Sequence, residues 1–252
     1  MTTKEATFIY TLRLADDALI LGHRLSELCS RGPILEEDLA LTNVSLDMIG
    51  RAQALLEYAA DIEGKGNTED DLAYRRPEIN YYNHLLTEQP NGDFAHTIAR
   101  QLFISVFEFL FYTALEKSTD GTLSAIAAKA TKEVKYHKQH AIDWTLRLGD
   151  GTNESHKRMQ KAVNDLWMYT GELFEMDELD KLLMPEGIAV DLIPIKTHWQ
   201  TEIKNILTQA TLTMPEESYM QTGSRKGIHT ENLGHILSEM QYLQRAYPDA
   251  KW

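Results

Sequence analysis

The residues of this chain whose spacing could support chemistry are carboxylates and histidines in long segments with helical periodicity. They are Asp16 or Asp17, Asp47, Glu108, Glu133 and His137. A four-helix bundle can hold two iron ions when two helices each supply one Glu and the other two each supply a Glu-x-x-His pair. Residues three apart lie on one helix face, so the carboxylate and the imidazole point the same way. The sequence can therefore be tested for a di-iron site.

Both Glu-x-x-His pairs are defective. Three residues after Asp47 stands Gly50, which has no side chain to bind a metal. Three residues before His137 stands Val134, while Glu133 is displaced by one position. Asp16, Asp17 and Glu108 could serve as the single carboxylates, but they cannot replace the missing pairs. The sequence predicts no metal in this chain, with Asp47, Gly50, Glu108, Glu133 and His137 as vestigial positions.

Glu133 and His137 also allow a different interpretation. Residues four apart on a helix can share one metal ion, as in zinc metalloproteases. With Asp47 and Glu108 they could form a degenerate site in an independent metal-dependent oxidase. Alternatively, Glu133 pairs with Lys129 or His137 in an ordinary helix network. The sequence favours the ordinary network.

A basic and aromatic stretch offers another chemistry. Arg75 and Arg76 precede Asn80-Tyr81-Tyr82-Asn83 in an otherwise acidic chain. Guanidinium groups grip phosphates and aromatic rings stack on bases, so the stretch could hold an anionic nucleotide. It is also compatible with a surface connection packed by two tyrosines, which the sequence favours.

Helical periodicity runs through almost the whole chain, and no strand-like alternation is long enough to predict a sheet. Asp93 is a candidate N-cap for the third long helix. Residues 64–78 are predicted to form a polar connection. The predicted fold is all-α, a four-helix bundle with additional C-terminal helices in a single domain, residues 1–252. The predicted helices span residues 6–30, 36–62, 81–88, 94–117, 122–148, 153–174 with Asn153 as cap, 177–184, 195–211 and 230–245.

Composition limits the partners and the compartment. The formal net charge of -13 disfavours nucleic acid and anionic membranes. The single cysteine, Cys29, excludes an intrachain disulfide and fits a reducing compartment. We expect no membrane span and no signal peptide. The sequence therefore predicts a cytoplasmic protein.

Several long motifs carry a resemblance to a known family. The most distinctive are EQPNGDFAHTIARQ at residues 88–101 and HTENLGHILSEMQYLQR at residues 229–245. Shorter matches include YTLRL at 10–14, DLAL at 38–41 and EGIAVD at 186–191. With these motifs the chain resembles, over nearly its whole length, the C subunits of bacterial phenylacetyl-CoA epoxygenase (1,2-epoxidase), a multicomponent monooxygenase of phenylacetate catabolism.

The resemblance implies a ferritin-like fold and a structural subunit without catalytic activity of its own. A di-iron cofactor is expected in a catalytic partner of the same heteromer and none in this chain, which could form a homodimer when isolated. A reductase component is expected to deliver electrons. Phenylacetyl-CoA is expected near the subunit interface. The residues of this chain that the resemblance places at coenzyme A are Asn80, Tyr81, Tyr82, Asn83, Lys181, Leu182 and Leu183.

Overall fold

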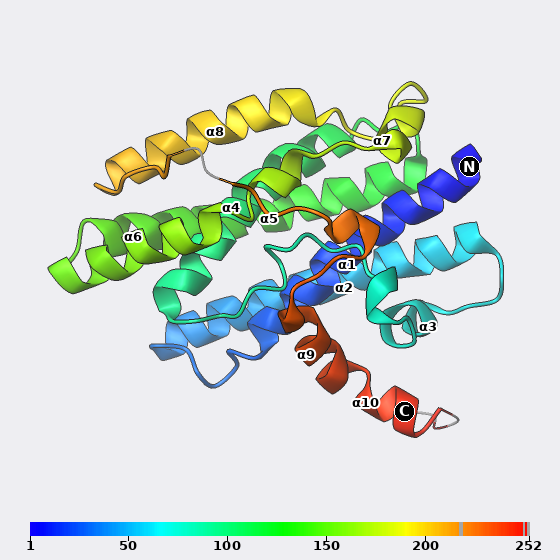
Figure 1. Ribbon diagram of the computed structural model, residues 1–252, viewed down its shortest axis with the longest axis horizontal. Helices are drawn as coiled ribbons and strands as arrows, with labels where there is room; N and C mark the ends of the chain where they lie inside the picture. Colours follow the sequence, from blue (N-terminus) through cyan, green and yellow to red (C-terminus); the bar gives the residue numbers. More distant parts are fainter. Residues whose placement is uncertain (217–218, 249, 251–252) are drawn as a thin grey trace. The chain divides into compact units, whose positions relative to one another are not determined.

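The chain is helical, as the sequence predicts. A computed structural model describes residues 1–216, 219–248 and 250, and within these ranges it contains no β-strand (Figure 1). The all-α prediction is therefore confirmed. The elements are α1 (Thr3–Ser26), α2 (Leu35–Glu63), α3 (Glu69–Tyr74), η1 (Glu78–Asn80), α4 (Phe94–Leu115), α5 (Gly121–Gly149), α6 (Asn153–Trp167), η2 (Gly171–Phe174), α7 (Glu178–Leu183), α8 (Leu192–Gln209), η3 (Ser224–Lys226), α9 (Glu231–Met240) and α10 (Tyr242–Ala246).

The helices fall into two compact units. Unit 1 comprises residues 1–90 and 223–252, and unit 2 comprises residues 91–222. Unit 1 is therefore made from two separate stretches of chain, whereas unit 2 is continuous. The prediction of a single domain stays a prediction, and each unit is described by itself.

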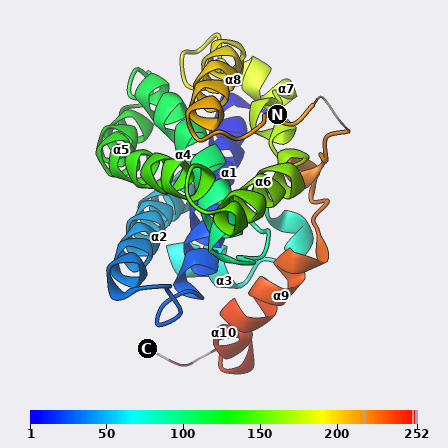
Figure 2. The same ribbon diagram turned by 90° about the vertical axis from the view of Figure 1, so that its left-hand side faces the viewer.

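Unit 1 is built on the long pair α1 and α2, which lie side by side in both views (Figures 1 and 2). Close approach of the two helices depends on Gly22. A Cβ at this position would lie 2.9 Å from the Ile49 side chain, and the Ser45 hydroxyl donates to the Gly22 carbonyl at 2.7 Å. Helix α2 ends at Gly64, whose φ of 69° is the left-handed conformation that glycine adopts without strain.

Unit 2 packs α5, α6 and α8 around α4. Asp93 caps α4 as predicted, because its carboxylate accepts from the His96 backbone amide at 3.0 Å. The Trp199 indole N–H donates to the Phe103 carbonyl at 2.9 Å, which anchors α8 on α4. Aromatic rings from α4, α6, η2 and α8 meet around this contact: Phe103, Phe107, Trp167, Phe174 and Trp199.

The prediction of a helix at residues 81–88 is wrong. This segment is non-helical and, apart from the half-buried Tyr82, buried. Short helix α3 occurs instead within the stretch predicted as a polar connection, and η1 begins at its last residue. The side chains of residues 81–88 include Asn83, His84 and Glu88, all of which are buried and hydrogen-bonded to polar groups of unit 1. Tertiary hydrogen bonds outweigh the weak local helical preference of a short segment.

Two other predicted helices are longer than the real ones. Helix α6 ends at Trp167 rather than near residue 174, and its cap is Thr152 rather than Asn153. The predicted C-terminal helix is divided at Gln241 into α9 and α10. Thr230, at the start of α9, makes no side-chain capping bond; its hydroxyl donates to Glu88 at 2.8 Å and accepts from the Asn232 side-chain amide at 3.2 Å. The remaining long helices agree with the prediction within a few residues.

Helix α4 corrects the expectation that no stretch approaches a membrane span. Residues Phe94–Leu115 are long and apolar enough to cross a membrane by length and composition alone. However, 78% of the most apolar window is buried inside the protein. The core helix of a packed domain passes the same test, so this is weak evidence for a membrane helix.

The aromatic contact between α8 and α4 yields a stability prediction. Trp199→Ala removes a large side chain that is 1% exposed and leaves a cavity among the neighbouring rings. We expect the free energy of unfolding to fall by about 3–5 kcal/mol in urea denaturation. Tyr136→Ala, at a side chain that is 53% exposed, is the matched control and should change stability by no more than about 0.5 kcal/mol. An equal effect of both changes would contradict this view of the core.

Candidate functional site

On helix α5 the two predicted metal positions, Glu133 and His137, differ in burial. Val134 and His137 are buried, whereas the Glu133 side chain retains 17% exposure. The Glu133 carboxylate lies 3.5 Å from the Lys129 ammonium, one of the two pairings that the sequence allows. The inward position three residues before His137, where a metal pair needs a carboxylate, is therefore occupied by an apolar valine.

Helix α4 of the same unit carries the third vestigial position. Glu108 is 6% exposed and therefore lies in the buried part of the helix surface. A buried carboxylate and a buried imidazole such as His137 are suitable metal ligands by type. However, Glu108 lies on a different helix and cannot replace the carboxylate that a Glu-x-x-His pair needs at the position of Val134.

Helix α2, in unit 1, carries the other two vestigial positions. Asp47 and Gly50 are both half-buried. Arg51, four residues after Asp47 and so on the same side of the helix, is only 3% exposed. A buried guanidinium near a carboxylate opposes the binding of a metal ion there, because the guanidinium and the metal ion are both positively charged.

No group of three or more His, Cys, Asp or Glu side chains within residues 1–216, 219–248 and 250 is arranged to hold a metal ion. With Gly50 and Val134 at two of the positions that need a metal-binding side chain, the residues present do not fit a di-iron cofactor. Whether the protein binds metal in solution stays a prediction.

The carboxylates of α1 are committed to arginines of unit 1. Arg76 donates to Asp16 through both terminal nitrogens, one at 3.0 Å, and the Tyr82 backbone amide adds a third bond at 2.9 Å. Arg225 of η3 donates to Asp17 at 2.9 Å. Neither carboxylate is left to serve as the single ligand that the sequence allowed.

Asp17 is held in its charged form by its neighbours. Burial raises the pKa of this carboxyl, but the charges of Arg225 and His84 and the hydrogen bonds from His84 outweigh it and lower the pKa to about 2. The His84 backbone amide donates to Asp17 at 2.6 Å and its ring nitrogen lies 3.0 Å away. Asp17 therefore stays ionised throughout the physiological range.

A second buried ion pair joins Glu88 to His229. Both side chains have 0% exposure, and His229 Nδ1 lies 2.9 Å from one Glu88 oxygen. The Thr230 amide and hydroxyl donate to the other oxygen at 2.7 and 2.8 Å, and Asn83 donates to the first at 2.9 Å. Both oxygens of Glu88 thus meet two donors each, as a buried carboxylate requires.

The neighbours of His229 favour its protonated form. Its Nε2 lies 2.9 Å from the Tyr81 carbonyl, so both ring nitrogens face acceptors and only the imidazolium can donate to both. Burial lowers the pKa of His229, but the hydrogen bond and charge of Glu88 and the Tyr81 carbonyl outweigh burial and raise it.

The predicted coenzyme A residues of unit 1 divide between surface and core. Asn80 and Tyr82 retain solvent exposure, whereas Tyr81 and Asn83 have 0% exposure. The Tyr81 hydroxyl donates to the Ala73 carbonyl, and its ring lies 4.2 Å from the Arg76 guanidinium. Tyr81 and Asn83 therefore hold the segment in place from within.

A groove of about 490 Å³ opens beside the exposed members of this segment. Its walls include Phe8, Arg75, Asn80 and Tyr82, but also the carboxylates of Glu63 and Asp71. Arg75 lies 3.2 Å from Asp71, and Arg76 is committed to Asp16. The positive charge that the sequence placed here is thus largely neutralised by neighbouring acids.

The other three predicted contact residues lie on α7 in unit 2. Lys181 and Leu182 are exposed, and Leu183 is buried. The Lys181 ammonium donates to Glu178 at 2.7 Å on the helix surface. Of the seven predicted residues, the two units expose Asn80, Tyr82, Lys181 and Leu182.

Comparison with known proteins identifies the family. A family model described as phenylacetic acid catabolic protein matches residues 1–252, the whole chain. The chain belongs to this phenylacetic acid catabolic family. It is also 49% identical over 243 residues to the C subunit of 1,2-phenylacetyl-CoA epoxidase from Escherichia coli (strain K12), covering 96% of this chain and 98% of that protein. The resemblance seen in the motifs is confirmed.

Membership in the phenylacetic acid catabolic family also confirms the fold class. The family is ferritin-like, which agrees with an all-helical chain built on the long pairs α1–α2 and α4–α5. Sequence reasoning did not single out Glu88 or Arg225, whose partners are far along the chain. Glu88 is the first residue of the motif at residues 88–101, and Arg225 lies shortly before the motif at residues 229–245. Only the structure reveals that Glu88 pairs with His229 and Arg225 with Asp17.

The raised pKa of His229 predicts a pH-dependent contribution to stability. This contribution is complete below the pKa of the unfolded chain and is lost as the pH rises through the higher pKa of the folded protein. His229→Asn keeps a donor for Glu88 but not the charge. We expect this substitution to cost more free energy of unfolding at about pH 6 than at about pH 9 in urea titrations. A cost that does not change with pH would contradict the assignment of a charged His229.

Proposed function

We propose that this chain is a non-catalytic structural subunit of a multicomponent phenylacetyl-CoA epoxidase in aerobic phenylacetate catabolism. In the cytoplasm it supports a di-iron catalytic partner that epoxidises the aromatic ring, with electrons from a reductase component. The 49% identity with the C subunit of such an epoxidase, over 96% of this chain, supports the assignment to this kind of complex.

The observation that carries the non-catalytic role is the inward face of α5. Val134 stands where a Glu-x-x-His pair would place its carboxylate, and Glu133 is turned toward Lys129. On α2, Gly50 cannot coordinate, and the buried Arg51 adds positive charge near Asp47. Helices α2 and α5 therefore each lack the carboxylate and histidine pair that a catalytic di-iron site would need.

A protein without metal still contributes to catalysis by holding its partner in shape. Catalytic groups must be kept within a fraction of an ångström of their productive positions, and rigid packed helices supply that support. Obligate interfaces between subunits commonly bury about 2,000 Å² or more. The long helices of this chain suit such an interface.

Activity of the reconstituted complex tests the role of the vestigial positions. Asp47→Asn and Glu133→Gln preserve side-chain shape while weakening metal binding. We expect phenylacetyl-CoA-dependent oxygen consumption to remain within about twofold of the unsubstituted complex, because these groups do no chemistry.

The competing hypothesis gives the opposite result. In an independent oxidase that uses Asp47, Glu108, Glu133 and His137, each substitution would abolish activity. The isolated chain would then contain stoichiometric metal by elemental analysis and consume oxygen without the catalytic partner. Either result would overturn the proposed structural role.

We further propose that coenzyme A at the subunit interface is contacted by the exposed residues among the predicted contacts, namely Asn80, Tyr82, Lys181 and Leu182. Tyr82→Ala and Lys181→Ala should raise the KM for phenylacetyl-CoA by about three- to tenfold with kcat unchanged, because they remove binding rather than chemistry. Lys161→Ala, another exposed helix lysine, is the control. Unchanged KM values in the complex would remove these residues from the substrate site.

A further inference from the structure

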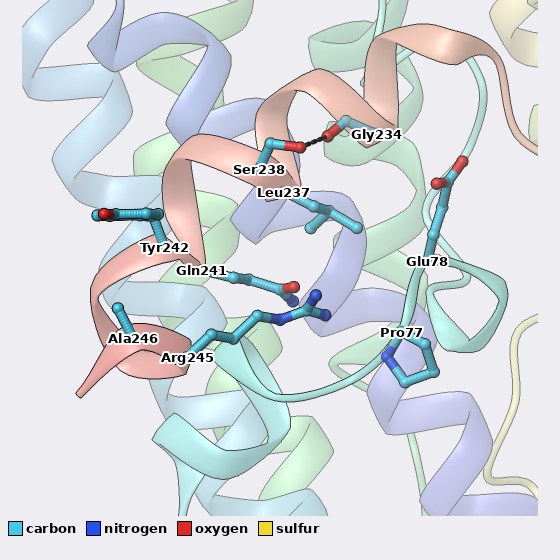
Figure 3. A pocket seen from close by; sticks show the side chains of 9 residues that line it. All are labelled: Pro77, Glu78, Gly234, Leu237, Ser238, Gln241, Tyr242, Arg245 and Ala246. Carbon is cyan, nitrogen blue, oxygen red and sulfur yellow. Dashed lines mark hydrogen bonds between the residues drawn. The ribbon is translucent and has the colours of Figure 1, made fainter. Parts of the chain in front are cut away.

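A groove of about 630 Å³ lies in unit 1 between the C-terminal helices and the turn that follows α3 (Figure 3). Its walls include Pro77 and Glu78 on one side and Leu237, Gln241, Tyr242 and Arg245 on the other. The volume falls within the range of sites that hold ligands of moderate size. None of these residues belongs to the vestigial metal positions or to the predicted coenzyme A contacts.

The base of the groove is held rigidly by Gln241, at the break between α9 and α10. Its side chain is 1% exposed, and its amide nitrogen donates to the Arg76 carbonyl at 3.0 Å and to the Tyr81 hydroxyl at 2.8 Å. Both amide N–H groups are thereby used. Gln241 therefore forms a fixed, buried floor of the groove (Figure 3).

The two charged walls have unused bonding capacity. Arg245 donates one long bond, at 3.4 Å, to the Arg76 carbonyl, although a guanidinium has five N–H groups. Glu78 is exposed and makes no ion pair within the part of the chain that the structure describes. Figure 3 shows Glu78 and Arg245 extending from different elements around the opening. The groove therefore offers the N–H donors of Arg245 and the carboxylate of Glu78 to an incoming group.

Apolar side chains surround these polar groups. Leu237 and Pro77 line the groove, and Tyr242 at its edge is 64% exposed. The residues next to the lining, Ile79 and Leu243, are 65% and 47% exposed. Large apolar side chains gathered at the surface of a protein mark sites of interaction with other proteins.

We propose that this groove binds an extended segment of another polypeptide, with a Lys or Arg side chain on Glu78 and an apolar side chain against Leu237 and Tyr242. The peptide backbone supplies carbonyls for the N–H groups of Arg245. A small anion is a poor occupant because Glu78 and the exposed Glu231 and Glu239 of α9 repel it. The net charge of -13 further favours a cationic segment by steering its approach.

This inference rests on the proposed function, which supplies the occupant as a segment of another epoxidase subunit. The test places the photo-crosslinking residue benzoylphenylalanine at Tyr242 of the full chain, co-expressed with the other epoxidase subunits. The same residue at Tyr136, an exposed tyrosine of unit 2, is the control. Mass spectrometry of the crosslinked peptides identifies what occupies the groove.

The expected result is a crosslink from position 242 to one segment of a different subunit that carries a Lys or Arg near an apolar residue. Glu78→Lys should lower its yield about tenfold, and the reciprocal charge reversal in the partner segment should restore it. Glu239→Lys makes the same charge change on α9 outside the groove lining and should leave the yield within about twofold.

Three outcomes overturn the inference. They are a yield from position 242 no higher than from position 136, a crosslink to a second copy of this chain, and a yield that is insensitive to Glu78→Lys. If the complex still co-purifies in those cases, the proposed function stands and only the groove assignment fails. If no complex forms with any variant, the proposed function fails as well.

Discussion

The buried pair of Glu88 and His229 is the interaction on which the organisation of unit 1 depends. An ionised carboxylate is stable in the interior only when it is paired and fully hydrogen-bonded. Glu88 meets this condition with donors from Asn83, His229 and Thr230. Since those donors come from a non-helical segment and from the returning C-terminal stretch, the pair joins two distant parts of the chain. Loss of either partner would leave an uncompensated buried charge.

Two further carboxylates extend the same principle to α1. Asp16 binds Arg76, and Asp17 binds Arg225 and His84. Ionisable side chains of a helix bundle interior are here used for positioning, with each acid matched to a base. Together with the apolar Val134 on α5, this use of charge is an argument for the proposed structural role.

The long helices were predictable because each carries a clear apolar period and recognisable ends. Asp93 and Gly64 act as the cap and the stop that their residue types suggest. The segment 81–88 was not predictable, since its conformation depends on Glu88 and Asn83 meeting partners about 140 residues away and within the segment itself. By contrast, the absence of Glu-x-x-His pairs could be recognised from residue spacing alone. The commitment of Arg76 to Asp16 and the burial of Tyr81 required the structure, because exposure within a polar loop has no periodic signal.

The discontinuity of unit 1 has a consequence for the order of events on the ribosome. Residues 91–222 form a continuous unit that is complete before the last stretch of chain is made. Unit 1 instead needs Arg225, His229 and Gln241 to satisfy acids and carbonyls of its N-terminal half. During synthesis, Asp17 and Glu88 therefore lack these later partners while residues 91–222 fold. A nascent chain that stops short of residue 223 leaves this half without its closing segment, a state that chaperones and proteases recognise.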